Sequence, residues 1–208
     1  GDDGYFCFAL EPEDPENVKP LWHKPGPKSE DGKEGEPIYR DCETSPIAVG
    51  GKVYVGLGIG GEAVCCLDAE TGEELWRQET PYPVFSAPAV SDGRLYIGMG
   101  VGDYINSAEV VRANTIKKLK DEGKSDEEIA ELTKDIRPVG EVWCIDISQE
   151  KPDVIWKFPT ERTVLGTVAI GEDRVFFGTR GGVFYGVSKD GAELGKFNAR
   201  KPIFTSPA

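Results

Sequence analysis

Three segments of the chain repeat one pattern of apolar and polar positions. Each reads basic, aliphatic, aromatic, apolar and then glycine: GKVYVG at 51–56, GRLYIG at 93–98 and DRVFFG at 173–178. Such a short and almost continuously apolar run predicts a strand that is covered on both faces, and the final glycine lets the chain turn. We therefore expect an inner strand, lying between stacked sheets, at each of these places.

Further matched segments surround each of these strands. Runs of small side chains precede them at 45–49, 87–90 and 167–170, with a fourth copy at 206–208. Apolar runs follow at 63–68, 142–146 and 184–188, with another copy at 5–11. A last strand in each unit closes on an aromatic residue: Trp22, Trp76, Trp156 and Phe197. Four strands joined as a meander, repeating about every 40 residues, are typical of a β-propeller.

The expected fold class is therefore all-β, a β-propeller of four-stranded antiparallel blades. About three complete blades and fragments at both ends fit into the chain at this period. The chain starts in the third strand of one blade and stops in the first strand of another. We therefore expect residues 1–208 to be one propeller fragment, completed by the remaining blades of a longer chain or by a protein partner.

Two insertions interrupt the repeat. The first, residues 11–44, is rich in Pro, Glu, Lys and Gly and predicts long surface loops. The second, residues 103–139, separates the two central strands of one blade, and its residues 107–120 are helix formers that end near Gly123. Ser125 followed by Glu128 is a capping box that begins a second helix. We expect a helical hairpin that projects from the propeller.

One unit resembles a known family. The sequence CLDAETGEELW at 66–76 is similar to the tryptophan-docking motif of pyrroloquinoline-quinone (PQQ)-type propeller repeats, Ala-x-Asp-x-x-Thr-Gly-x-x-x-Trp, and departs from it only at Cys66. An Asp side chain can cap the turn, and the Trp can pack on the next blade. The residues expected in this structural role are Asp68, Thr71, Gly72, Trp76, Asp146, Trp156 and Trp22. The resemblance implies a PQQ-like propeller in an extracytoplasmic or periplasmic, bacterial setting.

Composition narrows the range of partners. The chain carries 37 acidic and 24 basic residues, a net charge of −13, so a nucleic-acid backbone or an anionic membrane surface would be repelled. No apolar stretch approaches the 18 or so residues of a transmembrane segment. The five cysteines form no C-x-x-C pair and there is one histidine, so we predict no metal site.

Several motifs are better interpreted as structure than as chemistry. The glycines of 56–61 match a dinucleotide fingerprint, but a strand follows where a helix N-terminus is required, which indicates a hairpin turn. Some quinoprotein dehydrogenases of the resembled family carry a bonded adjacent cysteine pair beside the cofactor. Cys65 and Cys66 lie in a predicted strand, where neighbours point to opposite faces, so we expect buried thiols. His23 is expected in a solvated loop.

Residues that do not repeat are the candidates for function. They lie in loops between blades or between central strands, which should open on one face, and function tends to lie on such loops. The candidate binding residues are Arg40, Tyr82, Phe85, Tyr104, Asn106, Arg162 and Arg180.

Three functions remain open. The favoured hypothesis is a non-catalytic binding or scaffolding propeller, without a cofactor, that acts through its loop face and helical insertion. The second is part of a dehydrogenase that uses PQQ and calcium, for which no catalytic residue can be assigned. The third is a ligand-sensing propeller appended to a larger protein.

Overall fold

The computed structural model describes residues 4–24, 39 and 41–207, and within them the matched segments form antiparallel sheets of sequential strands. Blade 1 contains β3 (Ile47–Val49), β4 (Lys52–Leu57), β5 (Ala63–Asp68) and β6 (Glu74–Glu79). Blade 2 contains β7 (Ala89–Ser91), β8 (Arg94–Gly100), β9 (Gly140–Asp146) and β10 (Asp153–Thr160). Blade 3 contains β11 (Ala169–Ile170), β12 (Arg174–Gly178), β13 (Val183–Ser188) and β14 (Glu193–Asn198). An N-terminal sheet pairs β1 (Tyr5–Cys7) with β2 (Trp22–Lys24).

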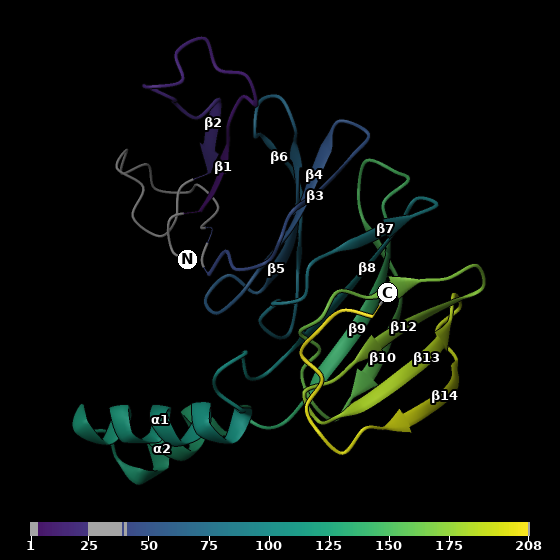
Figure 1. The fold of residues 1–208 in the computed structure, drawn as a ribbon. Coiled ribbons are helices and arrows are strands. Elements are labelled where there is room, and N and C mark those ends of the chain that lie inside the picture. The colour runs from purple at the N-terminus through teal and green to yellow at the C-terminus, as the bar shows by residue number, and fades with distance from the viewer. Residues whose placement is uncertain (1–3, 25–38, 40, 208) are drawn as a thin grey trace.

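The blades stack side by side around their short first strands (Figure 1). Strand β7 contacts both β3 and β11, so the innermost strands of the three blades adjoin one another. Small side chains at these positions allow that approach. The expected β-propeller architecture is confirmed, and the described blades do not close into a ring.

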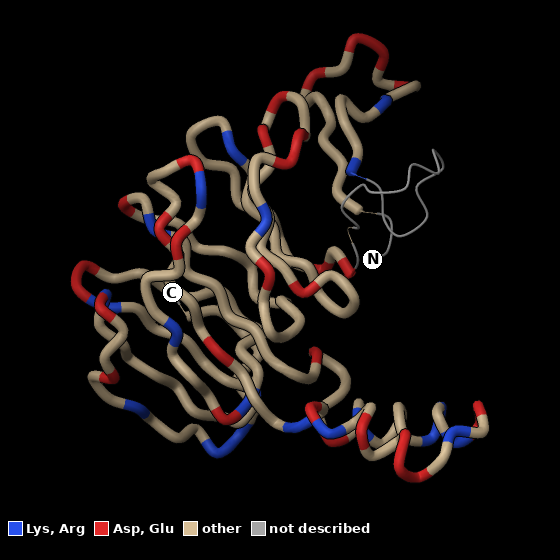
Figure 2. Tube along the Cα trace, turned by 180° about the vertical axis from the view of Figure 1, so that it is seen from behind, with Lys and Arg blue, Asp and Glu red and all other residues tan. Residues whose placement is uncertain are grey.

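The helical insertion forms two helices, α1 (Ala108–Asp121) and α2 (Asp126–Thr133). The Ser125 hydroxyl accepts a hydrogen bond from the Glu128 N–H, and the Glu128 carboxylate accepts one from the Ser125 N–H, which is the expected capping box. Gly123, with φ +77°, ends α1. The hairpin extends away from the blades, with acidic and basic positions along its length (Figure 2). Among the described elements, the two helices contact only each other.

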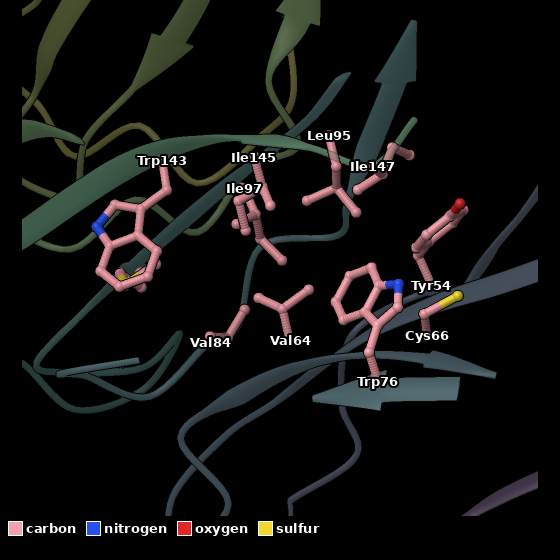
Figure 3. Close-up of a cluster of buried hydrophobic side chains, with 11 residues drawn as sticks. Tyr54, Val64, Cys66, Trp76, Val84, Leu95, Ile97, Trp143, Ile145 and Ile147 are labelled. Carbon is pink, nitrogen blue, oxygen red and sulfur yellow. The ribbon is translucent and has the colours of Figure 1, made fainter. Parts of the chain in front are cut away.

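Apolar side chains fill the spaces between blades. One cluster joins Tyr54, Val64 and Trp76 of blade 1 to Leu95 and Ile145 of blade 2 (Figure 3). A second cluster joins blades 2 and 3, and a third joins the N-terminal sheet to blade 1. The central strands of blades 1 and 2 are therefore covered on both faces, as their continuous apolarity predicted, whereas those of blade 3 are covered on one.

Tryptophans of the outermost strands contact turns of the following blade. The Trp22 indole N–H donates to the Ala69 carbonyl at 3.0 Å, and the Trp156 indole N–H donates to the Lys189 carbonyl at 2.9 Å. The Asp68 carboxylate accepts hydrogen bonds from the Thr71 N–H and hydroxyl, which shapes the first of these turns. In blade 2, the Asp146 carboxylate accepts instead from the Ser148 N–H and hydroxyl.

Two details differ from the sequence expectations. His23 lies in strand β2, not in a loop, and its ring stacks on Phe6 with a centroid separation of 3.9 Å. The strand expected to close on Trp22 therefore continues to Lys24, because these residues pair with β1. Residues 25–38 and 40 of the 11–44 insertion lie outside the described residues. The fourth copy of the first-strand motif forms no strand up to residue 207.

No described helix combines the length and apolar character needed to cross a membrane. The outer face of blade 3 carries exposed apolar side chains, including Leu194 and Phe197. Together with Phe176 and Phe184, they line a hollow of about 230 Å³. In blades 1 and 2, the corresponding face is buried against the next blade.

Candidate docking site on the loop face

The loops between the two central strands of a blade and the loops between blades emerge on the same side of the propeller. In blade 1, Ala63 at the start of β5 pairs with Glu79 at the end of β6, so the β4–β5 loop and the loop leading to blade 2 lie together. In blade 2, Gly140 pairs with both Gly100 and Thr160. The helical hairpin, which connects β8 to β9, therefore rises from this side, which we call the loop face.

A hollow of about 160 Å³ lies on the loop face between blades 1 and 2. Four separate loops supply its walls: the segment before β3, the β4–β5 loop, the β6–β7 loop and the segment between β8 and α1. The lining residues are Asp41, Glu43, Ile59, Phe85, Asp103, Tyr104 and Ile105. We call this feature the loop-face hollow.

Backbone hydrogen bonds hold Asp41 in place. Its carbonyl accepts from the Gly58 N–H at 3.1 Å, and its carboxylate Oδ2 accepts from the Ile59 N–H at 2.7 Å. A Cβ at Gly58 would lie 2.3 Å from that same oxygen, so only glycine permits this approach. The glycine-rich turn at 56–61 is therefore a hairpin turn, as expected, and it also positions a carboxylate.

The opposite wall is the segment between β8 and α1. The Asp103 Oδ1 atom accepts hydrogen bonds from the Ile105 N–H at 2.6 Å and the Asn106 N–H at 2.5 Å, which fixes a tight turn. The Tyr104 hydroxyl donates to the Leu165 carbonyl at 2.9 Å. Burial, with a smaller contribution from the Glu43 charge, raises the pKa of the Tyr104 phenol, so this group stays a neutral donor at physiological pH.

Arg180 supports this wall from blade 3. Its guanidinium donates to the Asp103 carbonyl at 2.7 Å and lies 5.2 Å from the centroid of the Phe204 ring. Weaker contacts at 3.4 Å reach the Tyr104 and Ile105 carbonyls. The contacts join residues 103–105, at the base of the hairpin, to the neighbouring blade.

The hollow combines apolar surface with negative charge. Ile59 is 54% exposed and Ile105 is 85% exposed, whereas Phe85 is only 3% exposed and forms the buried end. Three acidic side chains line it, and the described lining residues include no lysine or arginine. A surface of this kind suits a partner that brings both apolar contact and positive charge.

The sequence-based candidates divide into three groups. Phe85 and Tyr104 line the hollow, and the Asn106 amide contacts the Asp103 carboxylate at 3.4 Å. Arg162 lies at the base of the hairpin, where it forms an ion pair with Glu109 of α1. Tyr82 packs against the core between blades 1 and 2, so it is a packing residue and not part of the hollow.

Arg40 lies outside the described residues. Sequence reasoning missed five lining residues: Asp41, Glu43, Ile59, Asp103 and Ile105. Ile59 and Ile105 could have been identified from the sequence. Ile59 lies in a polar, glycine-rich loop and Ile105 lies shortly before a helix, and neither position belongs to a core strand.

The two adjacent cysteines form no bonded pair in this structure. Cys65 and Cys66 are free thiols in a regularly paired strand, one facing the N-terminal sheet and the other facing blade 2. A bonded adjacent pair would need a bent backbone at this point. Burial raises the pKa of Cys66 to about 11 and raises that of Cys65 further. No three His, Cys, Asp or Glu side chains of the described part group as metal ligands.

Comparisons with known proteins agree with this architecture. A family model described as outer membrane protein assembly factor BamB matches residues 14–120, slightly more than half of the chain. Quinohemoprotein alcohol dehydrogenase ADH IIB of Pseudomonas putida is 42% identical over an aligned length of 60 residues, and the match covers 26% of this chain and 8% of that protein.

A solved structure has the same fold at low sequence identity. A europium-containing methanol dehydrogenase is 12% identical, with a TM-score of 0.55 over 89% of this chain and 36% of its own. BamB from Moraxella catarrhalis is 14% identical, with a TM-score of 0.45 over 72% of this chain and 34% of its own. The chain thus spans about a third of these structures and a small part of the curated relative. On the family-model match, the chain belongs to the BamB-like, PQQ-repeat family of β-propellers.

Proposed function

We propose that this chain is part of a non-catalytic, extracytoplasmic propeller that docks a protein partner through its loop face and helical hairpin. The observation that carries the proposal is the loop-face hollow, which has exposed isoleucines and rigid walls and lies directly beside the hairpin. The periplasmic setting rests on the family resemblance and on the description of the matched family as an outer membrane assembly factor. The remaining blades of a ring would come from a longer chain or from another protein.

The size of the hollow favours a protein over a small ligand. Pockets for small molecules usually enclose about 300–1,000 Å³ and cover most of the ligand. A hollow of about 160 Å³ accommodates one or two side chains of a partner. This comparison disfavours the ligand-sensing hypothesis.

The hairpin supports the same reading because it lies outside the blades. Its helices contact no strand among the described residues, and Val110 and Leu132 remain exposed on its surface. Ordering each residue costs about 1–2 kcal/mol of backbone entropy. Capping at Ser107 and Ser125 offsets part of that cost without contributing to any blade. An ordered insertion with exposed apolar side chains is suited to contact with another protein.

Deletion of the hairpin tests the proposal. Residues 107–134 are replaced by a short glycine turn, and the purified variant is compared with the parent in unfolding and in affinity capture from an extract of the source cells. We expect an intact fold and loss of a specific captured protein. A reversal of charge on the opposite face, Glu150→Lys, serves as the control and should retain capture. Retained capture by the deletion variant would contradict a role for the hairpin.

The second candidate is part of a PQQ- and calcium-dependent dehydrogenase. The 42% identity over 60 residues to a quinohemoprotein alcohol dehydrogenase favours it. When bound, the quinone would accept electrons from an alcohol, and in this chain no residue is assigned to hold it. Titration of the purified chain with PQQ and calcium, followed by the absorbance of the bound quinone, separates the candidates. Saturable, calcium-dependent binding would favour the dehydrogenase.

A further inference from the structure

We propose that the loop-face hollow receives a single lysine or arginine side chain from a partner segment in which apolar residues flank that basic residue. This inference rests on the proposed function and specifies the chemistry of the partner. It identifies the hollow as the point where positive charge is recognised and the exposed isoleucines as the contacts for the flanking residues.

The first argument is the uncompensated charge of the hollow. Asp41, Glu43 and Asp103 all line it, and no basic side chain among the described residues does. Glu43 is exposed, and its carboxylate makes no hydrogen bond or ion pair with the described residues. All three carboxylates would attract a cation placed in this small hollow.

Arg180 contacts this wall through backbone carbonyls and not through these carboxylates. Its guanidinium donates to backbone carbonyls of residues 103–105 and lies over the Phe204 ring. It forms no ion pair with the three lining carboxylates in the described part of the chain. Arg180 therefore holds the backbone of the wall without pairing with these carboxylates.

The second argument is that the site is already organised. Backbone N–H groups hold one oxygen of Asp41 and one oxygen of Asp103, so these two carboxylates would lose little freedom on binding. A charged group fixed before the partner arrives avoids the ordering cost that weakens most exposed ion pairs. Glu43 can move to complete the contact.

The third argument is the match in shape and polarity. Lysine and arginine carry an apolar stem that ends in a charged head, and such side chains bury the stem against apolar surface while the head meets polar groups. Phe85 and the half-exposed Tyr104 ring offer that apolar surface inside the hollow. Ile59 and Ile105 extend it outside, where neighbouring apolar residues of the partner would pack.

Nothing in the hollow favours a metal ion or a nucleic acid instead. The three carboxylates do not group as ligands of one ion. The net charge of −13 opposes any polyanion. A basic and apolar peptide segment is the occupant that fits both the charge and the exposed isoleucines.

A peptide titration tests the inference. The 208-residue chain is titrated against a fluorescein-labelled peptide with the sequence Ala-Leu-Lys-Leu-Ala and against versions with norleucine or glutamate in place of lysine, and binding is followed by anisotropy. We expect the lysine peptide to bind at least about threefold more tightly than the norleucine peptide at low salt, and this advantage to disappear near 1 M salt. Equal binding of the lysine and glutamate peptides, or no binding up to about 1 mM, would overturn the inference.

Charge substitutions locate the binding. Glu43→Lys should weaken the lysine peptide at least about fivefold and Glu43→Gln by less, whereas Glu150→Lys, the same change on the opposite face, should alter binding less than about twofold. Because Glu43 is exposed, both variants are expected to fold, and circular dichroism checks this. Equal effects of Glu43→Lys and Glu150→Lys would overturn the assignment to the hollow. A partner that still docks on the loop face in that case would leave the proposed function standing, so the two failures are distinguishable.

Discussion

The indole N–H of Trp156 donates a hydrogen bond to the carbonyl of Lys189, and this contact joins the last strand of blade 2 to a turn of blade 3. The ring also covers Gly191, where a Cβ would lie 2.8 Å from the indole Cγ. Trp22 and Gly72 repeat the relationship two interfaces earlier, between the N-terminal sheet and blade 1. Between blades 1 and 2 it is incomplete, because the Trp76 indole N–H is buried without a partner among the described residues.

Substitution of the turn glycines by alanine should separate two physical effects. Gly72 has φ +70° and lies under the Trp22 ring, so Gly72→Ala combines backbone strain with a clash and should cost about 3 kcal/mol of unfolding free energy. Gly50→Ala, with φ +60° and open space, should cost about 1 kcal/mol. Gly195→Ala has neither problem and should change stability by less than about 0.5 kcal/mol. Denaturant titration gives the three values, and equal losses at Gly72 and Gly50 would show that the ring contact does not matter.

Removal of the indole N–H alone should affect the three tryptophans differently. Benzothienylalanine keeps the shape of the ring and replaces the N–H by sulfur. At Trp22 or Trp156 it removes a hydrogen bond and should lower the free energy of unfolding by about 1 kcal/mol. At Trp76 it removes a buried, unpaired donor, so stability should be unchanged or higher. A loss at Trp76 equal to that at Trp156 would indicate a hydrogen bond that this structure lacks.

The buried thiols should make the protein sensitive to alkali. Burial raises the pKa of Cys66 and Cys144 from 9.0 to about 11, so the folded chain keeps protons that the unfolded chain releases. Their contribution to stability is complete below pH 9 and is lost as pH rises from about 9 to about 11. Unfolding midpoints measured across this range should fall, and Cys66→Ala with Cys144→Ala should flatten part of the decline. A thiol reagent at pH 8 should modify these cysteines only after denaturation.

The ion pair between Arg162 and Glu109 should restrict the motion of the hairpin and contribute little to the free energy of unfolding. The Arg162 side chain lowers the pKa of Glu109 from 4.5 to about 2. The contribution of the pair to stability is therefore complete above pH 4.5 and is lost as the pH falls from 4.5 towards 2. An exposed pair of this kind contributes about 0–1 kcal/mol. Glu109→Gln should therefore leave the unfolding midpoint nearly unchanged and increase the motion of α1 in ¹⁵N relaxation. Glu127→Gln on α2 is the control, and equal motion in both variants would argue against the restraint.

The sequence predicted the parts of the fold that local pattern determines. The central strands show continuous apolarity, and the capping box at Ser125 and Glu128 forms as expected. The hollow could not be predicted, because Asp41, Ile59, Phe85 and Ile105 are brought together from separate loops by the stacking of two blades. The position of His23 in a strand was also missed, because a three-residue strand that forms against one partner has no periodicity of its own.

The most direct test of the docking account is photo-crosslinking in the source cells. A benzoylphenylalanine residue at Ile105, which is exposed beside the hollow, is compared with the same residue at Gln149, which is exposed on the opposite face. We predict one discrete protein adduct from Ile105 that is lost when residues 107–134 are deleted, and no matching adduct from Gln149. An adduct that forms from Gln149 and not from Ile105 would contradict a docking role for the loop face.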